Sequence, residues 1–261
     1  MVATCGGDTP DGWTASCLVL DPINQRWDAN KMGSLTVAKD DEIVVAATLD
    51  NIGVYLAIGL ESDFLPAGRM QWQRGPDLPA YMTGPCAVAI APTSFLLING
   101  GNIREFDSSV AGPTSNKGWR ESTRWPTLKK DRLYASCSKV GQKVVIAGGQ
   151  NTRNYKSIRS TEVLDLLTRQ ITSGGKLRTA KKLFGAVTII DGGKERMFSL
   201  GGFAEFYFFF GWHNAYYKEV DEWVEETSSW RPVTSLLRKR TFFGAVSVPK
   251  QLFCPGHKRS T

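Results

Sequence analysis

Pairs of glycine residues recur along the chain at nearly regular intervals. They stand at Gly6-Gly7, Gly100-Gly101, Gly148-Gly149 and Gly201-Gly202, with a degenerate copy at 54–60 that ends near Gly59. Counted from the second position of each copy, the spacing is 42 to 53 residues. A period of this length is typical of chains that stack one supersecondary unit several times. The repeat therefore favours one array of similar units over two unrelated domains.

Short runs that precede the glycine pairs indicate β-strands. The runs at 95–99, 144–147 and 197–200 are apolar, rich in β-branched or aromatic residues, and bounded by glycine. A second strand precedes each run, because 183–190 aligns with 133–140 and almost letter for letter with 243–248. Tight turns such as 141–142 and 191–193 join the two strands.

Two more strands complete each unit. After each glycine pair comes a loop and then a third strand that often ends on an acidic residue, as at Asp21 and Asp165. A tryptophan then begins a fourth strand at Trp27, Trp72, Trp119 and Trp230, and Ile171 takes this place in one copy. The sequence thus predicts four antiparallel strands in about 50 residues.

These features resemble the kelch repeat. The resemblance rests on the paired glycines, on Trp27 about six residues after the third-strand acid Asp21, and on the four-strand period, and it covers nearly the whole chain. It implies an all-β fold, a β-propeller in which each repeat forms one blade around a central channel. Blades packed in a ring bury both faces of each sheet, and tryptophan suits the wide space between neighbours.

We expect a single kelch-type propeller over residues 1–261. Its blade units are 28–72, 73–119, 120–170 and 171–230, while 1–27 and 231–261 share a closing blade. This gives about five four-stranded blades. Kelch propellers usually carry six or seven, so a fragment of a six-bladed propeller is the alternative.

In the kelch family, partners dock on the face built by the loops that join strands two to three and four to one. A loop at 203–217 that maps to this face has nine aromatic residues among fifteen. Basic residues precede the first strand of successive repeats, where they would form a cationic rim suited to an acidic peptide. The candidate partner-binding residues are Lys130, Arg132, Lys182, Arg238, Arg240, Phe206, Tyr207, Phe209, Trp212 and Tyr216. The alternatives are solvated loop charges and an aromatic loop that folds back or forms an extra hairpin.

Five cysteines without a C-x-x-C pair predict mostly reduced thiols in a cytoplasmic protein. Cys86 and Cys137 share one repeated position and are expected to be core residues rather than nucleophiles. If an upstream signal peptide is missing, the chain is secreted, and Cys5 could then pair with Cys17, or Cys254 with an N-terminal cysteine. The segment 108–118, rich in Ser, Gly and Pro, is expected to be a mobile loop on the opposite face.

Composition and motifs exclude several function classes. The formal charge of +7 favours acidic partners, but no basic run reaches five residues, so no nucleic-acid partner is expected. No apolar run is long enough to cross a membrane. The only histidines, His213 and His257, leave little for a copper site of the galactose-oxidase kind. The glycine pairs lack the following helix of a phosphate-binding loop, and no cofactor or metal is expected.

The sequence therefore predicts a non-catalytic protein-interaction module with a protein or an acidic peptide as its partner. One version of this function is substrate recognition within a ubiquitin-ligase adaptor. The alternatives are a secreted carbohydrate- or matrix-binding propeller and an enzyme similar to sialate epimerases.

Overall fold

A computed structural model describes residues 2–9, 12–21, 26–28, 30, 32–36, 45–58, 60–208 and 211–241 of the chain. Its regular structure is almost entirely β-strand, arranged in antiparallel sheets of consecutive strands. We call the five larger sheets blades I to V in chain order.

The blades have the following strands. Blade I contains β1 (Val2–Thr9), β2 (Gly12–Asp21) and β3 (Arg26–Asp28), and blade II contains β4 (Val45–Leu49), β5 (Gly53–Ile58), β6 (Glu61–Pro66) and β7 (Gln73–Arg74). Blade III contains β8 (Cys86–Ala91), β9 (Ser94–Asn99) and β10 (Asn102–Asp107), and blade IV contains β12 (Ser136–Val140), β13 (Lys143–Ala147), β15 (Ser160–Asp165) and β16 (Ile171–Lys176). Blade V contains β17 (Gly185–Asp191), β18 (Lys194–Phe208), β19 (Gly211–Val224) and β20 (Ser229–Ser235).

The remaining elements are short. Strands β11 (Arg132–Leu133) and β14 (Gln150–Asn151) pair beside blade IV. The helical turns are α1 (Ser108–Ala111), the 3₁₀ turn η1 (Asn116–Gly118) and the 3₁₀ turn η2 (Ser122–Arg124).

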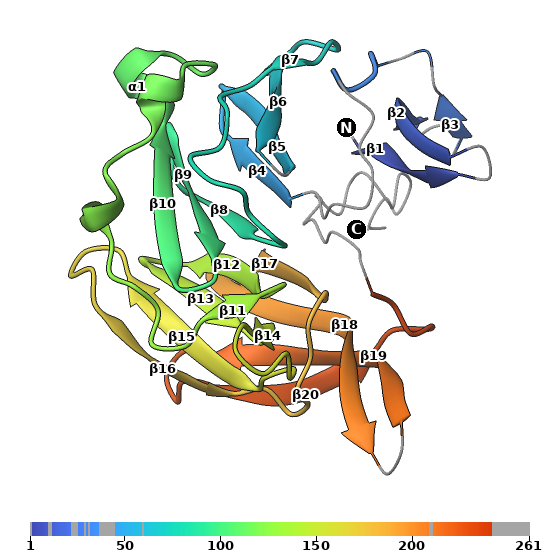
Figure 1. Ribbon diagram of the computed structural model, residues 1–261, viewed down its shortest axis with the longest axis vertical. Helices are drawn as coiled ribbons and strands as arrows, with labels where there is room; N and C mark the ends of the chain where they lie inside the picture. The colour runs from blue at the N-terminus through green and yellow to red at the C-terminus, as the bar shows by residue number, and fades with distance from the viewer. Residues whose placement is uncertain are drawn as a thin grey trace, which may run out of the picture.

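The blades follow one another around a common centre, from blade I through blades II and III to blades IV and V (Figure 1). The first strands of neighbouring blades contact one another, β4 with β8, β8 with β12, and β12 with β17. This arrangement confirms the predicted all-β fold and is that of a β-propeller. The predicted closing strand at 243–248 lies outside the described residues.

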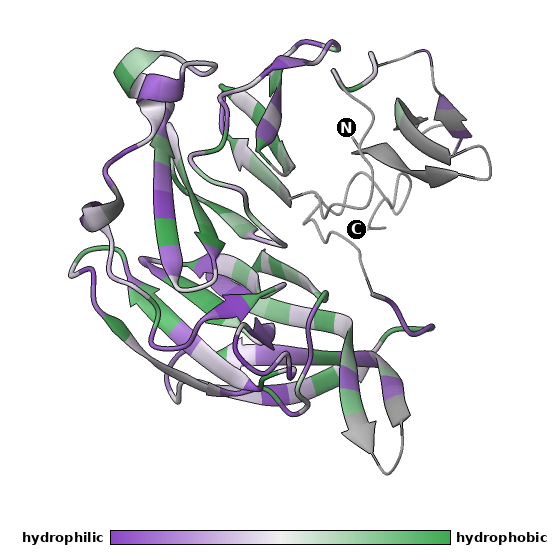
Figure 2. Cartoon of the chain, in the orientation of Figure 1, coloured by the Kyte–Doolittle hydropathy of each residue, from purple (hydrophilic) through white to green (hydrophobic). Residues whose placement is uncertain are grey.

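Apolar side chains fill the spaces between the blades. Leu96 of blade III and Val144 and Ile146 of blade IV lie in one core cluster and are fully buried. Figure 2 shows both hydrophobic and hydrophilic stretches along the blade strands, and the central strands β9 and β13 are buried along nearly their whole length, on both faces of their sheets. Burial between blades therefore holds together sheets that could not bury both faces alone.

Two of the repeated tryptophans bond back to the preceding blade, as their predicted place in the repeat requires. The indole nitrogen of Trp230 in blade V donates to Thr161 Oγ1 of blade IV at 2.8 Å. That of Trp119 donates to the carbonyl of Asp77, which follows blade II, at 2.8 Å. Each ring thus fills an inter-blade space and satisfies its one polar atom there.

The glycine pairs take two forms. In blades III and IV they follow the second strand, which ends at Asn99 or Ala147, as predicted. In blades I and V the strand continues through the pair, and the pairing register shifts there. The glycine pairs, which the sequence indicates as the boundaries of the second strands, therefore do not end the strand in these two blades, because a β-bulge absorbs the extra residue there.

A second recurrent feature lies where the chain enters the first strands. Gly84, Tyr134 and Leu183 each stand just before β8, β12 or β17, and their φ angles are 57°, 56° and 55°. The amide of Tyr134 donates to the carbonyl of Gly84 at 2.9 Å, and the amide of Leu183 donates to that of Tyr134 at 3.2 Å. These left-handed residues thus link three blades by successive backbone hydrogen bonds.

Segment 108–118 differs from the predicted mobile loop, because it contains α1 and η1. The Asp107 side chain caps α1 by accepting from the amide of Ser109 at 3.0 Å. The Tyr55 hydroxyl donates to the carbonyl of Pro113 at 2.9 Å, which ties the segment to blade II. The segment is therefore held by local capping and by contacts across blades.

Two of the shared repeat positions are joined covalently. Cys86 of β8 and Cys137 of β12 form a disulfide between the first strands of blades III and IV. Cys17 is also disulfide-bonded, and Cys5 is opposite it in the β1–β2 register. The prediction of mostly reduced thiols is therefore wrong, whereas the exclusion of Cys86 and Cys137 as nucleophiles agrees with their bonding.

Among the described residues, no helix has the length and apolar character needed to cross a lipid bilayer.

Candidate partner-binding site

The predicted cationic residues lie on the segments that lead into the first strand of each repeat. We call 129–134, 178–184 and 238–241 the lead-in segments. Each is tied to a glycine pair by a backbone hydrogen bond: Gly100 N donates to Arg132 O at 3.1 Å, Gly149 N to Lys181 O at 2.8 Å, and Gly202 N to Arg240 O at 2.8 Å. Repeated backbone contacts thus bring the three segments to equivalent places in successive blades.

Close packing at these contacts explains the local sequence. Gly149 has φ of 94°, and a Cβ there would lie 2.7 Å from the carbonyl oxygen of Leu133. Glycine can adopt this φ angle, and it has no side chain to fill the space. The lead-in segment can therefore approach the glycine pair closely.

Arg132 is enclosed rather than part of an exposed rim. Its guanidinium donates to the carbonyls of Gly148 and Ser160 at 3.0 and 2.8 Å, and pairs with Glu162 at 2.5 Å. Its side chain has no exposed surface. Burial lowers the pKa of Arg132, and the charge of Glu162 opposes that shift. Glu162 also accepts from the amides of Lys129 and Lys130, so it fixes the whole lead-in segment.

Lys182 is also enclosed. Its ammonium lies 2.8 Å from Glu205 Oε2 of β18 and over the rings of Tyr134 and Phe203. Only 7% of its side chain is exposed. Arg132 therefore ties its lead-in segment to blade IV, whereas Lys182 links blade V to Tyr134 of that segment. Their charges are already neutralised by Glu162 and Glu205.

The other predicted cations are exposed. Lys130, Arg238 and Arg240, with their neighbours Lys129 and Lys239, have exposed side chains. No acidic residue of the described chain forms an ion pair with any of them. Arg178, on the same segments, is exposed but pairs with Asp221 at 3.1 Å. We call the five exposed cations without an acidic partner, Lys129, Lys130, Arg238, Lys239 and Arg240, the outer cations, and they are open to a ligand.

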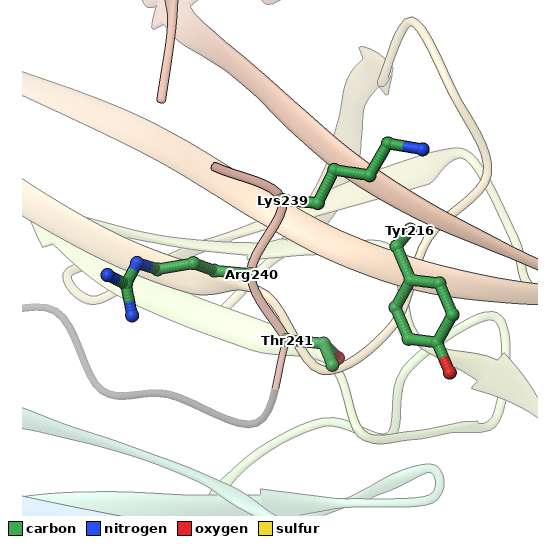
Figure 3. A pocket seen from close by; sticks show the side chains of 4 residues that line it. All are labelled: Tyr216, Lys239, Arg240 and Thr241. Carbon is green, nitrogen blue, oxygen red and sulfur yellow. The ribbon is translucent and has the colours of Figure 1, made fainter. Parts of the chain in front are cut away.

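The larger hollow beside these cations has a volume of about 540 Å³ and is lined by Tyr216, Lys239, Arg240 and Thr241. Figure 3 shows that the side chains of Lys239 and Arg240 leave the segment in different directions, while Thr241 lies between Arg240 and the Tyr216 ring. The hollow combines a phenol ring, a hydroxyl and two cations, which is a chemistry that suits an acidic polypeptide.

A smaller hollow of about 170 Å³ lies at the lead-in segment of blade IV. Its lining comprises Lys129, Lys130, Asp131, Asn151 and Arg153. Asn151 accepts from the amides of Arg153 and Asn154, so a local turn holds this side. Three cations and one carboxylate leave this hollow with a net positive charge.

The aromatic loop forms an extra hairpin, which was one of the sequence alternatives. Strands β18 and β19 extend beyond the glycine pair, with pairing from Gly202–Tyr217 to Phe208–Gly211, and project from blade V (Figure 1). We call this extension the ribbon. The Tyr216 and Phe203 rings pack at a tilt with centres 5.0 Å apart, and Phe206 stacks on His213 with ring centres 5.8 Å apart. Phe206 and Tyr216 remain about half exposed.

Of the other aromatic candidates, Tyr207 and Trp212 pair across the ribbon in register. Their side chains, and the whole of Phe209, lie outside the described part of the chain.

The structure adds lining residues that were not among the sequence candidates. Lys239 stands between two candidates in the basic cluster, so its neighbours gave a usable signal. Arg153 and Asn151 lie in the loop between strands two and three of blade IV, and only the repeat position of this loop could have suggested them. Tyr216 and Arg240, both predicted, are brought together at the larger hollow.

A comparison with models of known protein families gave no match, and a comparison with curated proteins gave none either.

Proposed function

We propose that this chain is a non-catalytic propeller that binds an acidic segment of a partner protein at the outer cations of its lead-in segments. One observation carries the proposal: the enclosed cations on these segments and the exposed Arg178 have acidic partners, whereas five other exposed cations, Lys129, Lys130, Arg238, Lys239 and Arg240, have none among the described residues. Two hollows open beside the exposed cations. Opposite charge on the partner would steer association and fix its position.

We further propose that the propeller is of the kelch type. The glycine pairs, the repeated tryptophans and the four-strand period support this class. A substrate-recognition role in a ubiquitin-ligase adaptor would require a cytoplasmic chain. The Cys86–Cys137 disulfide favours an oxidising compartment instead, so we place the binding activity outside the cytoplasm.

The binding test uses a fluorescent ten-residue peptide of alternating glutamate and threonine and measures anisotropy at low and high salt. We expect the double variant Lys239→Glu/Arg240→Glu to bind at least about tenfold more weakly than the native protein, because repulsion replaces attraction. High salt should weaken native binding, since exposed charges are screened. The matched control Lys117→Glu/Lys176→Glu makes the same change in net charge at exposed sites outside the hollows.

An equal loss in both double variants would show that only net charge matters, and would contradict the proposed site. A disulfide-bonded secreted protein could also take an acidic polysaccharide, which is the second candidate. Binding of heparin that is lost in Lys239→Glu/Arg240→Glu, without binding of the peptide, would favour that candidate.

A further inference from the structure

Among the described strands, one edge of β19 has a neighbour along only part of its length. Strand β20 pairs with β19 from Val224–Ser229 to Glu219–Ser235. The amide of Leu236 then donates to Lys218 O at 2.7 Å, and Arg240 N donates to Tyr217 O at 3.2 Å. Beyond this point no described strand continues the row. Residues 211–216 therefore pair only with β18 among the described strands.

The ribbon that carries this edge is well supported at its base. Lys182 and Phe203 exchange backbone hydrogen bonds of 2.8 and 3.0 Å, and the Lys182 ammonium pairs with Glu205. The tilted rings of Phe203 and Tyr216 pack against each other as a cross-strand pair. A strand held in its extended form loses little conformational freedom when a partner pairs with it.

The charges beside this edge identify what could cover it. Lys218, Arg238, Lys239 and Arg240 are all exposed next to the point where β20 departs. A second copy of the chain would bring the same cations to the edge, which disfavours pairing between two copies. An acidic segment would neutralise them, and unpaired strand edges are known templates for an added strand.

We infer that an extended acidic segment of a partner protein adds as a strand to residues 211–216 of β19, in the row that β20 leaves at Ser235. Its backbone pairs with β19, and its carboxylates meet Lys239 and Arg240 at the larger hollow. Six residues of strand span about 20 Å, which sets the length of the recognised segment. This inference rests on the proposed function and specifies how the same site reads its ligand.

The test compares the alternating glutamate–threonine peptide with two N-methylated versions of it. In one version the glutamate amides carry the methyl groups, and in the other the threonine amides carry them. In a β-ladder, alternate residues direct their amides toward the neighbouring strand. We expect one version to lose at least about tenfold in affinity and the other to change little. A shift of the peptide by one residue along β19 is disfavoured, because it would turn the glutamate side chains to the other face of the sheet, away from the cations.

A second measurement keeps the protein unaltered. On addition of the unmodified peptide, we expect alternate backbone amides within 211–216 to gain protection from hydrogen exchange. Equal binding of all three peptides without new protection would overturn the added strand and leave the proposed function intact. No binding by any peptide would overturn both. A dimer in solution whose edge amides are already protected without peptide would overturn the assigned occupant.

Discussion

Burial removes the water that normally stabilises a guanidinium, so Arg132 depends on Glu162 and on two backbone carbonyls. Removing one partner of such a pair is costly, because the other charge remains buried without compensation. We expect Glu162→Ala to lower the free energy of unfolding by about 3–5 kcal/mol in urea denaturation. Glu162→Gln keeps hydrogen-bond acceptance and should cost less.

The control for this prediction is the exposed pair of Lys194 and Glu226, whose side chains are both about 60% exposed. Glu226→Ala should leave the midpoint of urea denaturation almost unchanged, as is usual for surface pairs. Similar losses of stability in the two variants would mean that the buried Arg132–Glu162 pair adds no more to stability than an exposed pair does.

Lys181 makes stability depend on pH. It is fully buried, 3.9 Å from Asp221, with Glu219 and Arg178 nearby and the Phe184 ring 5.0 Å from its ammonium. Burial lowers the pKa of Lys181 to about 8, from 10.5. Between pH 8 and pH 10.5 the unfolded chain keeps a proton on Lys181 that the folded chain has lost. The free energy of unfolding should therefore rise with pH across this range, by on the order of 3 kcal/mol.

Lys181→Met removes this titration, so its stability relative to the native protein should fall steadily as pH rises from 8 to 10.5. Urea denaturation at several pH values measures the difference. Asp221 acts in the acidic range with the opposite sign, because burial raises its pKa above the usual value. A difference between the two proteins that is constant above pH 8 would contradict a buried ammonium.

The sequence placed basic residues at the lead-in segments correctly, but it could not separate exposed from enclosed ones. Arg132 and Lys130 stand two positions apart, yet one is buried and the other exposed. The distinction depends on Glu162, which lies thirty residues away in sequence from Arg132 and meets it only in the folded blade.

Blades III, IV and V join at the left-handed residues Gly84, Tyr134 and Leu183, and we call this junction the seam. The seam should be sensitive to added side-chain volume. A Cβ on Gly84 would lie 2.0 Å from the Tyr134 ring, at φ of 57°. Gly192 has nearly the same φ, 59°, but open space around it. We expect Gly84→Ala to destabilise the protein by at least about 2 kcal/mol more than Gly192→Ala, because only the first adds a clash to the backbone strain of about 1 kcal/mol.

Thermal and urea denaturation of both glycine variants would measure this difference. If the two variants lost equal stability, backbone conformation alone would explain the loss and the seam would be loosely packed.

At the scale of strands, the sequence predicted most of the architecture. The alternation and glycine boundaries of 95–99 and 144–147 located β9 and β13, since these signals are local. It did not predict the bulge at Gly202 or the α1 turn. Both depend on tertiary partners: the Arg240 lead-in at Gly202, and Tyr55 beside Pro113. The ribbon was only one of three alternatives for an aromatic loop, because aromatic content does not fix pairing.

At the scale of the whole molecule, the Cys86–Cys137 disulfide constrains the unfolded chain across one repeat. Replacing both residues, as Cys86→Ala/Cys137→Ala, should lower the free energy of unfolding by about 2–4 kcal/mol. The double variant is preferable to reduction, because Cys17 is also disulfide-bonded. Mass spectrometry after alkylation without reductant should leave Cys86 and Cys137 of the native protein unlabelled, and their labelling would contradict the bond.

The repeat alignment already placed Cys86 and Cys137 in equivalent positions of consecutive units, so their proximity follows from a ring of blades. Their oxidation did not follow, because burial of small apolar side chains explains such a position equally well. The ring of blades was thus predictable from the repeats. The Cys86–Cys137 disulfide and the two hollows became apparent only in the three-dimensional structure.

The inter-blade disulfide has a topological consequence, because it spans α1 and η1. A protease cut anywhere within 108–118 would divide the backbone between Cys86 and Cys137, yet both pieces would remain one covalent molecule. Such a clipped chain would migrate as a single species until a reductant released its two fragments.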